Sequence, residues 1–157
     1  MARIMNMDRC VNPRPVTFIN SVAGLERGLF LEIVGMAANN VWGGGVDDFE
    51  AYKVQLATAA TKVEDLVINT TVPKQYDERL EEKDFVAKKD AICRGHYIQT
   101  GDEYTIAKEF VGGDAQVGAE VALASDGKLA VGAEKAIGKI VKVYVWNGQE
   151  SVMIRFY

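Results

Sequence analysis

The chain has little of the side-chain chemistry on which catalytic and metal sites are usually built. His96 is the one histidine among 157 residues, which excludes catalysis by paired histidines and multi-histidine metal sites. Cys10 and Cys93 lie far apart in the sequence and form no CxxC pair, which favours two free thiols in a reducing cell. A single disulfide between them is the alternative. Cys93 and His96 have no third group to orient them as a nucleophile and base. We therefore expect a protein that is not an enzyme.

Phosphate-loop and calcium-loop spacings are also missing. Five residues rather than four separate Gly132 from Gly138, and Ile140 follows Lys139 where a phosphate loop needs Ser or Thr. The acidic run at 47–50 lacks the alternating ligand spacing of an EF-hand, so a solvated loop is the simpler interpretation. We expect no cofactor and no metal ion.

An excess of basic charge and a long apolar run are absent as well. Eighteen basic and 22 acidic residues give a net charge of −4, which disfavours nucleic acid as a partner. No segment is apolar for long enough to cross a bilayer, so no membrane partner is expected. The first fourteen residues lack the apolar stretch of a signal peptide, and we expect synthesis and assembly in the cytoplasm.

Short apolar runs separated by Gly, Asp and Asn dominate what is present. With 48% hydrophobic and 25% charged residues, the chain can bury one core. The spacing of the runs predicts a mainly β fold, a compact antiparallel β-barrel or sandwich. Residues 1–14, which end at Pro13-Arg14-Pro15, are predicted to form an extended N-terminal arm, and 15–157 a single β-rich domain. The predicted strands are 15–20, 28–34, 51–57, 66–68, 91–95, 104–107, 120–124, 128–131, 137–146 and 151–156.

Two segments interrupt this pattern. Residues 36–48, rich in Asn and Gly, are predicted to form an exposed loop. Residues 77–90 carry both signs of charge around two apolar residues, and either a short helix or a loop fits them.

Two dipeptides predict tight hairpins. Asn147-Gly148 separates the two longest strands, and Asp126-Gly127 separates two shorter ones. Both pairs suit a two-residue turn, because such a turn requires positive φ at its central residues.

The strand 137–146 is apolar on both faces. In a regular strand, alternate side chains point to opposite faces. This places Val141, Val143 and Val145 on one face and Ile140, Tyr144 and Trp146 on the other. Such a strand is covered on both sides, either by its own chain or by a partner.

The run RGHYIQTGDEY at 94–104 lies within a wider pattern that resembles small β-rich head proteins of tailed bacteriophages. The other segments of the pattern are 76–78, 84–85, 117–118 and 137–139. The resemblance spans roughly 28–156 and leaves the N-terminal arm uncovered. It implies a decoration or cement subunit that binds the outside of a capsid lattice, in contact with the major capsid protein and as a homo-oligomer, with no catalytic residues.

The leading hypothesis is therefore a virion structural protein that decorates or stabilises a phage head and is located on the capsid surface. Two alternatives stay open: a tail-tube or head-tail connector component, and an OB-like nucleic-acid-binding module that stacks bases on Tyr97, Tyr104, Tyr144 and Trp146. The residues predicted to contact a partner come from the arm, the 36–48 loop and the last hairpin. They are Arg3, Arg9, Arg14, Trp42, Tyr144 and Trp146.

Overall fold

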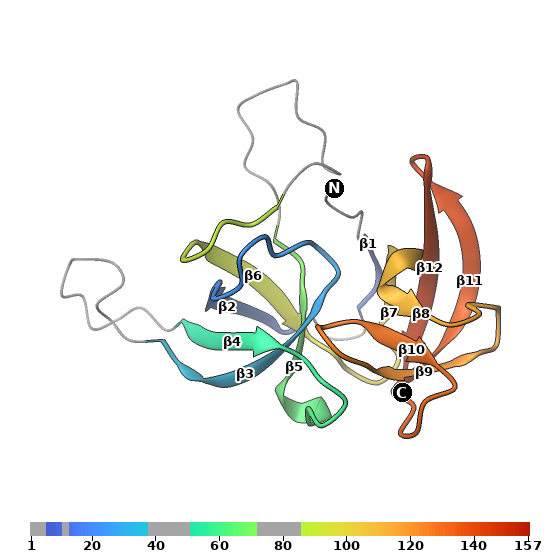
Figure 1. Ribbon diagram of the computed structural model, residues 1–157, viewed down its shortest axis with the longest axis horizontal. Coiled ribbons are helices and arrows are strands. Elements are labelled where there is room, and N and C mark those ends of the chain that lie inside the picture. Colours follow the sequence, from blue (N-terminus) through green and yellow to red (C-terminus); the bar gives the residue numbers. More distant parts are fainter. Residues whose placement is uncertain (1–5, 11–12, 38–50, 72–85) are drawn as a thin grey trace.

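Two β-sheets, one closed and one open, form the protein (Figure 1). The computed structural model describes residues 6–10, 13–37, 51–71 and 86–157. The architecture confirms the prediction of a mainly β fold with a barrel, and it adds a second sheet to that barrel.

The closed sheet is a five-stranded barrel in the order β2-β4-β3-β5-β6. Its neighbours pair antiparallel, except that β2 and β4 run parallel. A 3-10 helix, η2 (Val63–Asp65), leads into β5. The barrel strands are β2 (Pro15–Ile19), β3 (Phe30–Met36), β4 (Tyr52–Leu56), β5 (Leu66–Asn69) and β6 (Ile92–Tyr97).

The open sheet has seven strands in the order β1-β7-β12-β11-β9-β10-β8. Its pairs are antiparallel except for β8 and β10. A second 3-10 helix, η4 (Lys108–Phe110), follows β7. The strands are β1 (Asn6–Arg9), β7 (Glu103–Ala107), β8 (Val111–Gly112), β9 (Glu120–Leu123), β10 (Leu129–Val131), β11 (Gly138–Trp146) and β12 (Gln149–Phe156).

Every strand predicted from the sequence is present, and β1 and β8 are additional. Both predicted hairpin turns are confirmed by their backbone angles. Asn147 and Gly148 have φ of 47° and 75°, and Asp126 and Gly127 have φ of 57° and 69°. Two successive positive φ values are those of a type I′ turn, whose twist matches the flanking strands.

Part of the segment predicted as an arm belongs to the open sheet. Residues 6–9 form β1 and pair with β7, where Asn6 lies opposite Thr105 and Met7 opposite Tyr104. The Cys10 thiol, directly after β1, donates a hydrogen bond to the Tyr104 hydroxyl over 3.3 Å.

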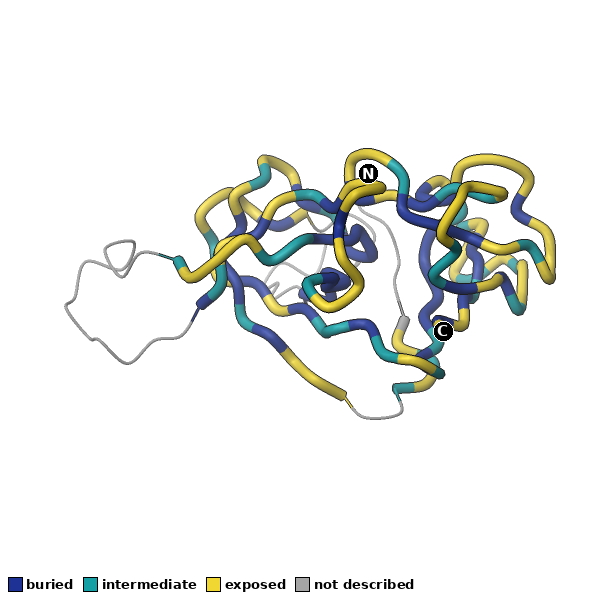
Figure 2. Tube along the Cα trace, turned by 90° about the horizontal axis from the view of Figure 1, so that it is seen from below, coloured by how far each residue is buried: buried dark blue, intermediate teal, exposed yellow. Residues whose placement is uncertain are grey.

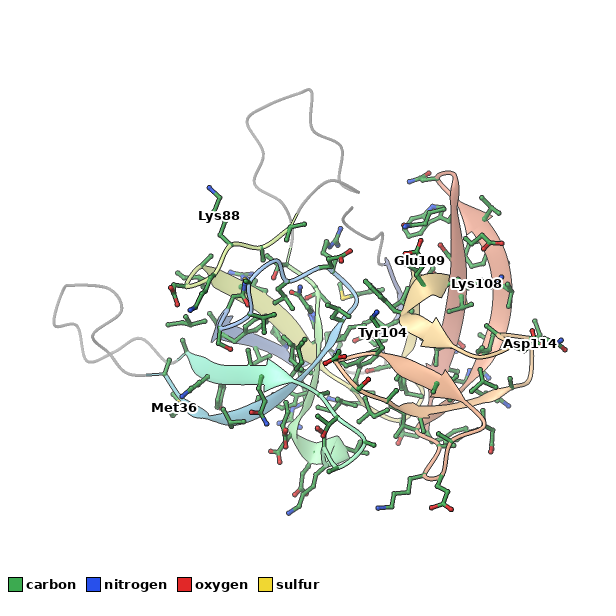
Figure 3. All side chains as sticks on the ribbon, viewed as in Figure 1. Met36, Lys88, Tyr104, Lys108, Glu109 and Asp114 are labelled. Atoms are coloured by element: carbon green, nitrogen blue, oxygen red, sulfur yellow. The ribbon has the colours of Figure 1, made fainter. Side chains whose placement is uncertain are left out.

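One hydrophobic core joins the two sheets. The Phe156 ring of β12 lies 5.9 Å from that of Phe30 in the barrel and 6.0 Å from that of Tyr104 in β7. Tyr104 occupies the junction between the sheets (Figure 3). The Gly127 turn also bridges them, since its amide donates to Ala57 and its carbonyl accepts the amide of Phe30, both over 2.9 Å. Buried residues are concentrated in the strands of both sheets, and several of the connecting turns are exposed (Figure 2).

Several predictions fall on residues that the structure does not describe. Arg3 and Trp42 lie outside the described residues, as do 38–50 of the predicted loop and most of the segment 77–90.

Candidate interaction surface on the open sheet

A β-bulge in β11 decides which side chains share a face of the last hairpin. Ile140 pairs with Ile154 and Lys142 with Met153, so Val141 is an extra residue. Beyond the bulge Val143 pairs with Val152. Because Val152 and Ile154 lie on the same side of β12, Ile140 and Val143 share that side too. The predicted grouping of Ile140 with Tyr144 and Trp146 is therefore wrong, since one inserted residue reverses the alternation.

Tyr144 and Trp146 instead lie on the side of the open sheet that faces away from the core. Tyr144 pairs with Ser151, and Trp146 pairs with Gln149. Directly paired residues point to the same side of a sheet, so successive pairs across β12, β7 and β1 define one surface, here called the outer face. The outer face includes Arg9, Glu103, Thr105, Ala107, Lys139, Lys142, Tyr144, Trp146, Gln149, Ser151, Met153 and Arg155.

A chain of hydrogen bonds ties the outer face together across three strands. The Thr105 hydroxyl donates to the Asp8 carboxylate over 2.5 Å, and its oxygen lies 2.8 Å from the Tyr144 hydroxyl. A hydroxyl has one proton, and that of Thr105 is used on Asp8, so Tyr144 is the donor in the second bond. β11 is thereby joined to β7 across β12, and Thr105 is fully buried beneath the link.

Charged side chains accompany the aromatic ones on this face. The Lys142 ammonium lies 4.4 Å from the centre of the Tyr144 ring, within the range of a cation–π contact. The Arg155 guanidinium donates to Glu103 over 2.7 Å. Trp146 stands at the end of β11, next to the turn, and is partly exposed. The face thus offers aromatic and cationic groups held in place by the sheet.

The opposite side of the same hairpin carries two exposed valines near the turn, with Glu150 paired to Val145 beside them. Ile140 and Val152 are buried in the core, but Val143 is 37% exposed and Val145 is 66% exposed. The hairpin extends past the core that covers its base (Figure 1).

Of the predicted contact residues that the structure describes, three lie on the outer face and one does not. Arg9 pairs with Glu103 in the same sheet as Tyr144 and Trp146. Arg14 lies at the barrel, with its guanidinium carbon 5.0 Å from the centre of the Tyr97 ring. Sequence reasoning did not name Lys142, Met153 and Arg155 as contact residues, although Lys142 alternates with Tyr144 in β11, and Met153 and Arg155 alternate with the core residues of β12.

Two titratable side chains of the barrel, Cys93 and His96, have pKa values that burial shifts. Burial raises the pKa of the Cys93 thiol, whose hydrogen bond with Thr71 acts in the opposite direction. Burial lowers the pKa of His96, and its Nδ1 lies 2.9 Å from the Thr70 hydroxyl. No group of three or more potential metal ligands occurs within the described residues.

A hollow of about 560 Å³ lies between the loop 59–64 and the loop 134–137. Its lining carries charges of both signs, from Lys62, Glu64, Glu134 and Lys135. Across the same described part of the chain, no helix is long and apolar enough to span a membrane.

Comparison with known proteins gave a likeness in structure and none in sequence. No protein-family model matches the chain, and no curated protein matches it. Among solved structures, the chain is similar to the N-terminal base of the head fiber protein gp8.5 of bacteriophage phi29, with a TM-score of 0.48 and 11% identity. The alignment covers 93% of this chain and 95% of that one.

Proposed function

We propose that this chain is a virion structural protein that binds the outer surface of a phage capsid and decorates or stabilises the head lattice. The observation that carries the proposal is the outer face. The fold brings Arg9, Tyr144 and Trp146, which come from opposite ends of the sequence, onto one side of one sheet.

The composition of the outer face suits a protein interface. Tyr, Trp, Met and Arg are the residue types enriched where proteins bind one another, and Tyr, Trp and Arg dominate their binding energy. The Tyr144 side chain is already held by Thr105 and Lys142, so little conformational entropy is lost when a partner covers it. Arg9, Lys142 and Arg155 place cations on this face, and Glu103 and Asp8 place carboxylates beside them. A capsid surface with charges of both signs fits this face best.

The nucleic-acid alternative receives less support from the rings on which it depends. Tyr104 is 1% exposed, Arg14 lies over Tyr97, and Tyr144 is bonded to Thr105. Base stacking needs a free ring face beside a cationic groove. Trp146, at the end of β11, is partly exposed.

Retention on washed virions tests the proposal. Trp146→Ser removes an aromatic anchor, and loss of such an anchor costs about 2 kcal/mol or more, roughly 30-fold in affinity. Arg9→Glu reverses a charge at the other end of the face. Both variants should leave the particle during washing, whereas Ile92→Ser, at an exposed position of β6 in the barrel, should stay.

Copy number separates the capsid proposal from a connector or tail-tube role. A decoration subunit should approach the number of capsid subunits, whereas a closed connector ring holds about a dozen copies or fewer. Full retention of Trp146→Ser and Arg9→Glu, or a ring-like copy number, would contradict the proposal.

A further inference from the structure

The outer edge of β11 is open over the half of the strand next to the turn. Its neighbour on that side, β9, pairs only with Gly138 and Lys139. Two further bonds join Ile140 to Gly118 and Ala119, over 2.8 and 2.9 Å. From 141 to 146, no strand in the described part of the chain pairs with this edge, and Figure 1 shows β11 on the outside of the hairpin.

The hairpin geometry identifies the backbone groups on this edge. In a two-residue hairpin the residues that flank the turn bond to each other, so the backbone groups of Trp146 point toward β12. Alternation then directs those of Tyr144 toward β12 as well. The N–H and C=O of Val143 and Val145 point outward, away from β12.

Such an edge is a template for another strand, and proteins usually protect it. β11 carries two recognised protections, the bulge at Val141 and the charge of Lys142. Both are at the end of the open stretch next to β9. Val143 and Val145 remain exposed and uncharged.

We propose that two copies of this chain dimerise by antiparallel pairing of their β11 edges, about a two-fold axis at Tyr144. In this register Val143 lies opposite the partner subunit's Val145, and Val145 lies opposite the partner subunit's Val143. Each outward residue exchanges two hydrogen bonds with its counterpart, so four backbone bonds form.

Other two-fold registers pair the outward backbone groups of the edge less favourably. An axis between two residues would bring outward groups against groups that are already bonded to β12. An axis at Val143 would place Val145 opposite the partner subunit's bulged Val141. An axis at Val145 would place Val143 opposite the partner subunit's Asn147, which has a left-handed backbone.

The side chains are complementary in the same register. On one side, Val143 and Val145 cover their counterparts, which removes apolar surface from water. On the outer face, Lys142 lies opposite the partner subunit's Trp146, a cation beside an aromatic ring, and this pair occurs twice. No two like charges are opposed.

The dimer also has a consequence that rests on the proposed function. A two-fold axis between antiparallel strands runs perpendicular to the sheet, so both outer faces point to the same side. Two outer faces would then contact one capsid surface, and the second contact would form at a high effective concentration.

Sedimentation of the purified full-length chain over a range of concentrations tests the pairing. We expect a reversible shift from the 17.2 kDa monomer to twice that mass. Val145→Pro removes an outward N–H and leaves the bonds to β12 in place, since proline is tolerated at such edge positions. It should abolish the shift, whereas Val145→Thr, which keeps the N–H, should retain it.

A disulfide tests the register without relying on the proline variant. In a Cys10→Ser background, Tyr144→Cys places two thiols across a non-hydrogen-bonded pair about 4.5 Å apart at Cα, close enough to bridge. Covalent dimers should form under oxidation, and Val143→Cys should form far fewer because it does not face itself.

A mass that stays monomeric at all concentrations, together with no covalent dimer from Tyr144→Cys, would overturn the dimer. Arg9 is separated from the edge by β7, β12 and β11, so Arg9→Glu tests the capsid contact alone. The dimer and the proposed function can therefore fail independently.

Discussion

The barrel and the open sheet differ in whether their strand edges are paired. Each barrel strand has a neighbour on both sides, because β2 and β6 pair and close the ring. The open sheet ends at β1 and β8 and leaves half of β11 without a neighbour among the described strands. Closure removes the sites at which another chain can add a strand, so the barrel is suited to stability and the open sheet to association.

The two regions also anchor their connections differently. Buried asparagines hold the long connections of the barrel: the Asn20 amide donates to the carbonyls of Ala87 and Lys88, over 3.1 and 2.8 Å, and that of Asn69 donates to Glu26 over 2.9 Å. The open sheet instead relies on short turns such as Asn147-Gly148. Its hairpins can therefore extend beyond the core, and the last one does.

The largest expected effect comes from the side chain that joins the two regions. Phe156→Ala removes a ring that is 2% exposed and contacts both Phe30 and Tyr104. The loss of transfer free energy and the resulting cavity should lower the free energy of unfolding by about 3–5 kcal/mol. Denaturant unfolding monitored by hydrogen exchange should show barrel and sheet amides losing protection together. Tyr157→Ala, at the exposed neighbouring position, should cost far less, and separate unfolding of the two sheets would refute a shared core.

Gly95→Ala probes the barrel alone. A Cβ at this position of β6 would collide with Val67 and lie 2.8 Å from the carbonyl oxygen of Ile68. We expect a loss of about 1–3 kcal/mol in the free energy of unfolding, as is typical of overpacking. Gly112→Ala in β8 is the matched control, because its Cβ would lie 3.7 Å from the carbonyl oxygen of Leu129, an ordinary van der Waals contact. Equal stability of the two variants would contradict the tight packing of the barrel.

Tyr144→Phe probes the outer face of the open sheet. It removes the hydroxyl that donates to Thr105 across β12 and keeps the ring under Lys142. The free energy of unfolding should fall by about 1 kcal/mol, the usual net value of one hydrogen bond. Amide exchange should accelerate in β1 and β11 more than in the barrel. Unchanged exchange in both strands would show that the link does not hold the face together.

The smallest effect is a dependence of stability on pH that originates in the barrel. Burial lowers the pKa of His96 below its usual value, against the influence of Asp102. The unfolded chain therefore binds the proton more readily, so stability is complete above the unfolded pKa of about 6.5 and falls as the pH drops toward the folded pKa. His96→Gln, which can still bond Thr70, should flatten the profile of unfolding midpoint against pH between about 5 and 7. A slope that persists in the variant would assign it to another group.

The strands and turns were predictable because they depend on local chemistry. Alternation identified β4 and β12, and positive φ at Asn147-Gly148 follows from residue types that tolerate it. The strand β1 was not predictable, because its sequence NMDR has no apolar alternation and its pairing with β7 is a long-range choice.

The candidate site was predictable only in part. Tyr144 and Trp146 stand out as aromatic residues in a strand that is apolar on both sides. The bulge at Val141 has no local signature, yet it decides which residues join them on the outer face. Lys142 alternates with Tyr144 and Trp146, and Met153 and Arg155 alternate with the core residues of β12, so the side of each strand on which they lie follows from the sequence. That they share one face with Arg9 follows only from the cross-strand register.

A cryo-electron microscopy reconstruction of virions that carry the native protein tests the central claim most directly. We expect the outer face, with Arg9, Tyr144 and Trp146, to contact the capsid while the closed barrel points away from it. A reconstruction in which the barrel contacts the capsid and the outer face of β11 and β12 is exposed to solvent would contradict the account.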